Sequence, residues 1–240
     1  MNKIVFHSNR IYNNYSEKFN PIPTKNSIPT WYTSASKYEI DENSGDPLLK
    51  YDGGRLPTFK ACPALLDIFT SGYMYVTPCN LTFSLKDGQP FVEVEQGFED
   101  FCAERPDMKN FEIPYGHYKK HFHWYPNWAP KLPKGYSAIY THPMNRFDLP
   151  FTTVAGIIDN DKMDTPGLMP FFLKDNFEGI IPAGTPFIQI IPFKREDWEM
   201  EIKLHDHEEI YDRHMYQAKI YRTKDGGAYK QKTWSKKKYL

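Results

Sequence analysis

Three histidines are the side chains in this sequence best suited to binding a metal ion. His121 and His123 are separated by one residue, so both imidazoles project from the same face if the segment is a β-strand. Two imidazoles on one face can bind a metal, and His142 is a third candidate ligand further along the chain. Short histidine patterns also arise by chance, and the same residues fit a sheet surface on which histidines are hydrogen-bonded. A metal-dependent β-barrel enzyme therefore stays open as an alternative.

Residues 135–193 contain the most strongly patterned part of the sequence. An apolar run at 154–158 ends at Asp159, and residues 180–191 repeat the pattern of a turn that opens into a buried strand. A purely structural reading explains both runs. Asp159 can cap a turn through its side chain, and Gln189 can satisfy backbone groups between strands.

The composition favours a β-rich globular protein without overall charge. Of 240 residues, 40% are hydrophobic, 16% are aromatic and 20 are prolines, which favours strands and aromatic loops over helices. Thirty basic residues balance thirty acidic ones, so no global field attracts nucleic acid or an anionic membrane. Nucleic acid could be bound only by the basic tail at residues 230–238. The same tail could instead bind an acidic neighbouring subunit or lie in solvent.

The cysteines and the N-terminal residues bear on the compartment. Cys62, Cys79 and Cys102 are an odd number without the spacing of a disulfide framework or a zinc knuckle, which fits a reducing compartment. The first residues lack the apolar core of a signal peptide, and no apolar run approaches the ~20 residues that span a membrane. We expect a soluble protein that is not secreted and does not bind a membrane.

Local patterns predict a strand and a hairpin. Residues 73–78 follow a glycine and read as a strand. Residues 81–85 and 91–95 alternate apolar and polar side chains on either side of Asp87-Gly88, a dipeptide typical of tight hairpin turns. One face of this hairpin should meet the core.

Two helices are also predicted. Residues 62–69 read as a short helix, with Pro63 in its first turn and Gly72 after its end. Residues 207–222 carry a single apolar stripe flanked by charges, which is typical of a helix packed on a sheet or on a partner.

Three regions follow from these patterns. Prolines interrupt residues 1–60, which we expect to form an extended N-terminal arm with loops. Residues 61–200 should form the core, a mainly β, jelly-roll-like barrel, and residues 201–240 a C-terminal helix and the basic tail. Large aromatic side chains recur at protein interfaces, and the interface candidates are Trp124, Tyr125, Trp128 and Trp234.

The order of turns and strands in residues 135–193 resembles the core of the dUTPase and dCTP deaminase superfamily. The resemblance implies a β-clip barrel and a catalytic role for Asp159, which would help to place the attacking water. It also implies substrate-binding roles for Gln189 and Arg146, with Mg²⁺ as the cofactor. The Arg-Ser-Ser segment that contacts phosphate in that family has no counterpart, because residues 141–146 occupy its place. Nucleotide hydrolysis is therefore the alternative, and the leading expectation includes no cofactor.

A second resemblance extends over most of the chain. Its residues include Ile28-Pro29, Trp31-Tyr32, Cys62-Pro63, Gly135-Tyr136-Ser137, His142-Pro143 and Ala183-Gly184-Thr185-Pro186. This combination is similar to a family of uncharacterised proteins of tailed phages, including T4-like ones. It implies a structural or assembly protein, located in the virion or the host cytoplasm, whose partners are further copies of itself or other virion proteins.

Overall fold

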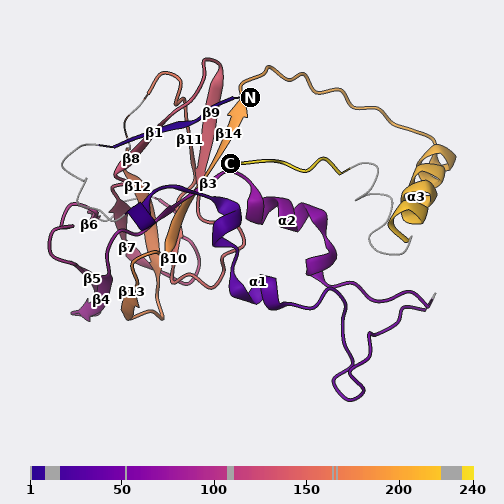
Figure 1. Cartoon of the computed structure of the whole chain (residues 1–240), viewed down its shortest axis with the longest axis horizontal. Helices are drawn as coiled ribbons and strands as arrows, with labels where there is room; N and C mark the ends of the chain where they lie inside the picture. Colours follow the sequence, from indigo (N-terminus) through magenta and orange to yellow (C-terminus); the bar gives the residue numbers. More distant parts are fainter. Residues whose placement is uncertain are drawn as a thin grey trace. The chain divides into compact units, whose positions relative to one another are not determined.

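Strands make up most of the regular structure, as the composition predicts. The computed structural model describes residues 2–8, 17–51, 53–106, 111–163, 165, 167–222 and 234–240. Within these residues the strands form four antiparallel sheets (Figure 1). The sheets do not close into a single barrel there, so a mainly β fold with one C-terminal helix is confirmed, but the jelly-roll barrel is not.

The chain divides into two units. The first contains residues 1–27, 71–195 and 239–240, and the second contains residues 28–70 and 196–238. These boundaries cut across the three regions expected from the sequence, because parts of the N-terminal and C-terminal regions belong to one unit.

The largest sheet of the first unit has five strands in the order β11-β9-β14-β3-β2. The strands are β2 (Ile22–Pro23), β3 (Tyr73–Val76), β9 (Tyr136–Thr141), β11 (Gly156–Ile158) and β14 (Pro186–Lys194). The strand β3 confirms the prediction for residues 73–78. The long β14 pairs with β9 on one side and β3 on the other. This central position explains why residues 186–190 are all buried.

A second sheet has the order β10-β12-β7-β6. It contains β6 (Cys102–Glu104), β7 (His117–Trp124), β10 (Phe151–Thr153) and β12 (Met169–Lys174). A three-stranded sheet consists of β13 (Gly179–Ile181), β4 (Leu81–Lys86) and β5 (Gln89–Val94), and β1 (Val5–Ser8) pairs with β8 (Trp128–Lys131). The β4–β5 pair is the predicted hairpin, and its two turn residues, Asp87 and Gly88, have φ values of 53° and 72°.

Aromatic rings from several strands fill the core of the first unit. Trp124 is completely buried and stacks on Phe171, with ring centroids 3.7 Å apart. Its indole Nε1 donates to the Thr153 hydroxyl, 3.1 Å away, so the buried donor is satisfied. The expectation that Trp124 lies at an interface is therefore wrong. Alternate residues of β7 face opposite sides, and Trp124 shares the buried side with Phe122.

Gly72, just before β3, lies in a position that only glycine fits. Its φ is 75°, in the left-handed region. A Cβ atom here would lie 2.9 Å from the carbonyl carbon of Ile190 on β14 and closer still to its oxygen. The carbonyl of Gly72 also accepts from the Thr24 amide, 3.1 Å away. Close approach of two backbones therefore fixes the start of β3 against β14.

The second unit contains all three α-helices of the described residues. They are α1 (Thr30–Ser34), α2 (Pro63–Thr70) and α3 (His207–Arg222), and the last two confirm the predicted helices. Tyr32 and Phe69 are buried and pack with ring centroids 4.5 Å apart. The Asp67 carboxylate accepts from the Trp234 indole at 2.9 Å and from the Lys237 ammonium at 2.6 Å, which ties residues 234–238 to α2.

Short elements complete the fold. The described residues also contain the 3₁₀ turns η2 (Glu17–Phe19), η3 (Thr24–Ser27) and η4 (Phe59–Ala61). Isolated bridges between Tyr38 and Pro57, Ile40 and Pro47, and Leu49 and Arg55 organise the loop between α1 and η4. None of the helices in the described part of the chain has the length and apolar character that crossing a membrane requires.

Candidate functional site

Asp159, the candidate catalytic residue, belongs to an ion cluster after β11. Its Oδ1 accepts from the Ser137 hydroxyl at 2.6 Å and lies 3.2 Å from the Arg195 guanidinium. Arg195 also forms two hydrogen bonds to Asp161 and one, of 2.9 Å, to Ser137. The backbone amide of Gly135 donates to Asp161 at 2.8 Å. One guanidinium thus joins the start of β9, the turn after β11 and the end of β14.

The cluster keeps both carboxyl groups ionised. The Ser137 hydrogen bond and the nearby Arg195 charge lower the pKa of Asp159. Hydrogen bonds from Arg195 and from the Gly135 amide hold the pKa of Asp161 well below its usual range. A carboxylate held in this way is a weak base, which suits a structural role more than proton abstraction.

Asn160 lies between the two acidic residues, is buried and forms hydrogen bonds to neighbouring segments of the first unit. Its Oδ1 accepts from the Tyr140 hydroxyl at 3.1 Å, and its backbone carbonyl accepts from the Leu132 amide at 3.2 Å. The turn at residues 159–161 therefore links several strands through both side chains and backbone. The catalytic role of Asp159 stays a prediction, and its surroundings are explained by this turn.

The two candidate substrate-binding residues also have partners within the protein. Gln189 is 1% exposed, accepts from the Met144 amide at 2.9 Å and donates to the Ser71 carbonyl at 2.9 Å. These contacts match the framework role expected for it between strands. The Arg146 guanidinium forms a two-pronged ion pair with Asp148, with the shortest contact at 2.8 Å. The polar groups of both side chains therefore have partners within the protein, without a substrate.

The three histidines lie in two different environments. His121 and His123 project from the same face of β7, as predicted, and His121 packs against Phe172 with ring centroids 5.7 Å apart. Burial, followed by the positive charges of nearby side chains, lowers the pKa of His123. His142 instead accepts from the Thr153 amide at 3.4 Å, and its Nε2 lies 3.2 Å from the Arg146 carbonyl.

Burial lowers the pKa of His142 to about 4, so its ring is neutral at physiological pH. Among the residues that the structure describes, no three His, Cys, Asp or Glu side chains gather in a way that could hold a metal ion. His142 is therefore held by hydrogen bonds, whereas the buried Nδ1 of His123 has no hydrogen-bond partner among the described residues.

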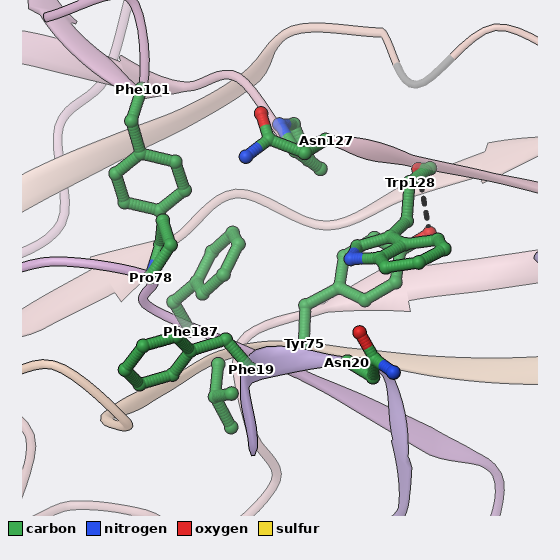
Figure 2. Close-up of a pocket in the computed structure, with 10 residues that line it drawn as sticks. Phe19, Asn20, Tyr75, Pro78, Phe101, Asn127, Trp128 and Phe187 are labelled. Carbon is green, nitrogen blue, oxygen red and sulfur yellow. Dashed lines mark hydrogen bonds between the residues drawn. The ribbon is translucent and has the colours of Figure 1, made fainter. Parts of the chain in front are cut away.

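An aromatic pocket opens in the first unit (Figure 2). It is a small pocket with a cavity volume of about 20 Å³, and its lining consists of Phe19, Asn20, Tyr75, Val76, Pro78, Phe101, Pro126, Asn127, Trp128 and Phe187. The Tyr75 hydroxyl donates to the Trp128 carbonyl at 2.8 Å, which fixes one wall. No lining residue is charged, and Asn20 and Asn127 supply the side-chain amides. The pocket therefore offers no charged side chain to hold a triphosphate.

Sequence reasoning identified only Trp128 among these lining residues. Phe19 and Asn20 come from the proline-interrupted region near the N-terminus, and Phe101 comes from a loop before β6. No periodic pattern marks residues that meet through tertiary folding. Tyr125, the neighbouring interface candidate, is half-buried, and its amide donates to the Phe101 carbonyl at 2.8 Å.

No family model matches the chain, and no curated protein does. What each region can do therefore follows from its own residues and contacts.

Residues 197–205 form the most exposed apolar feature of the second unit, and we call them the alternating segment. Its four apolar side chains are Trp198 (89% exposed), Met200 (83%), Ile202 (75%) and Leu204 (95%). Charged side chains or a histidine occupy every position between and beside them. The strict alternation is readable in the sequence, but it lies between the predicted core and the predicted helix, and no element was predicted for it.

Proposed function

We propose that this protein is a structural or assembly protein of a tailed phage that works through contacts between subunits. The observation that carries the proposal is the amount of large apolar surface on the second unit. Besides the alternating segment, Leu49, Tyr51 and Phe59 are 66% or more exposed in the region before α2. In the alternating segment the exposed apolar side chains occupy every second position, and contiguous exposed apolar surface is typical of surfaces that bind another protein.

The environment of the candidate catalytic residues favours assembly over nucleotide hydrolysis. Asp159 is bound by Ser137 and Arg195, and Gln189 is buried between two backbone groups. The aromatic pocket lacks the charged residues that a triphosphate and Mg²⁺ would require. The resemblance to phage proteins over most of the chain agrees with this choice.

Light scattering of the full chain over a range of concentrations tests the proposal. We expect masses that are multiples of the 28.2 kDa of one chain, and we expect the protein in purified virions analysed by mass spectrometry. A mass of one chain at every concentration, together with absence from virions, would overturn the proposal.

A turnover assay with deoxynucleoside triphosphates and Mg²⁺ tests the hydrolase alternative. We expect no turnover above background for the wild type and for Asp159→Ala alike. Turnover by the wild type that disappears in Asp159→Ala would replace assembly with hydrolysis as the function.

A further inference from the structure

The alternating segment has the pattern of a β-strand but pairs with no strand in the described part of the chain. It is extended, and its apolar residues occur at every second position. The side chains of Glu201 and Lys203 form an ion pair of 3.1 Å, which places both on the same side of the backbone. An extended chain with one apolar and one charged face is suited to a sheet that covers the apolar face.

The sequence of the segment is complementary to itself in the antiparallel direction. If two copies pair around Glu201, Glu199 of each copy faces Lys203 of the other, and Asp197 faces His205. On the opposite face Trp198 meets Leu204 and Met200 meets Ile202. Opposite charges and apolar pairs placed directly across from each other stabilise antiparallel strands.

Other alignments lose the charge pairing, the apolar pairing or both. A parallel, in-register pair would place each charged side chain opposite its own copy. Shifting the antiparallel pair by one residue would place apolar side chains opposite charged ones. Centring it on Met200 opposes Glu199 to Glu201 twice. Centring it on Ile202 keeps Glu201 opposite Lys203 and Glu199 opposite His205, but it leaves Trp198 opposite Asp206 and so breaks the apolar pairing. Centring on Glu201 leaves a single like-charge contact, at the axis.

We propose that residues 197–205 of two copies of this chain form an antiparallel two-stranded ribbon around a two-fold axis at Glu201. The inference rests on the proposed function, because it names the partner and the surface that assembly would use. A two-fold contact uses the same surface on both copies, which is what a self-complementary segment supplies.

The helix α3 provides a layer to cover the apolar face of this ribbon. It begins at His207, directly after the segment, and Ile210, Tyr211 and Met215 are 42%, 56% and 37% exposed. A two-stranded ribbon alone is marginally stable in water, so it needs such a layer.

Charge exchange in the full-length protein tests the pairing. Sedimentation equilibrium should show a dimer for the wild type, and Glu199→Lys and Lys203→Glu should each raise its dissociation constant roughly tenfold, because each change turns two attractions into repulsions. The double variant should return to within about threefold of the wild type. Glu112→Lys, the same change at an exposed position elsewhere, is the matched control and should leave the constant unchanged.

Cysteine cross-linking tests the register. In a Cys62→Ser background, Glu201→Cys should form a disulfide across the axis on mild oxidation, since the two residues 201 lie opposite each other. Lys203→Cys alone should not, but a mixture of Lys203→Cys with Glu199→Cys should form a mixed dimer. Equal cross-linking of all single variants would refute this register.

The outcomes separate the inference from the proposed function. A wild-type oligomer that both charge variants leave intact would overturn the ribbon while assembly stands. A wild type that stays a single chain would overturn both.

Discussion

Replacing Gly72 with alanine should cost more stability than replacing Gly184, although both glycines have a positive φ. The φ of 75° at Gly72 strains any residue with a Cβ, at about 1–2 kcal/mol. The new methyl group would also meet the Ile190 backbone, with its carbonyl carbon 2.9 Å away. Backbone cannot swing aside like a side chain, so β14 would have to move from β3. Losing one or two hydrogen bonds there adds about 1–3 kcal/mol, for a total of about 2–5 kcal/mol.

Gly184→Ala is the matched control. Gly184 has a φ of 88°, and a Cβ there would meet nothing within 4 Å. It should therefore carry the conformational strain alone, about 1–2 kcal/mol. The comparison isolates the collision with β14 from the strain of a positive φ.

Urea unfolding followed by tryptophan fluorescence measures both variants. The free energy of unfolding should fall by about 1–3 kcal/mol more for Gly72→Ala than for Gly184→Ala, with similar denaturant slopes. If the two variants lose the same stability, the close approach of Gly72 to β14 is not a constraint on this fold.

Two further predictions concern buried polar side chains. Gln189→Leu should lower the free energy of unfolding by about 2–4 kcal/mol, because the Met144 amide and the Ser71 carbonyl lose their partner, and the exposed Gln89→Leu should have little effect in the same urea titration. His142 has a pKa of about 4 in the folded protein and about 6.5 when unfolded, so its stabilising contribution is complete above pH 6.5 and is lost as the pH falls toward 4. His142→Gln should lose less stability than the wild type between pH 7 and 4.5, and parallel pH profiles would contradict the burial of a neutral ring.

Local patterns in the sequence were sufficient for the elements that depend on neighbouring residues. The Asp87-Gly88 turn, the helix start at Pro63 and the helix at residues 207–222 each have a short-range physical cause, and all three are present. The histidines of β7 share a face because strand geometry requires it.

The features that could not be predicted from the sequence depend on contacts between residues that are far apart in the chain. Trp124 carries an aromatic ring suited to an interface, and only the pairing of β7 with β12 shows that it belongs to the core. The pocket brings Phe19 together with Phe101 and Phe187, which are far apart in the sequence. The framework role of Gln189 was expected from its place between strands, but its partners could be found only in the structure.

The division of the chain into two interleaved units has a consequence for biosynthesis. Residues 28–70 leave the ribosome early, but residues 196–238, which complete their unit, follow the whole of residues 71–195. Asp67 of α2 can therefore form its hydrogen bonds to Trp234 and Lys237 only after every strand of the first unit has been synthesised. The first unit needs nothing beyond residue 195 except residues 239–240, so it can form its sheets earlier. Under the proposed assembly, the alternating segment would thus be made after the strands of the first unit, which would delay association until that unit has had time to fold.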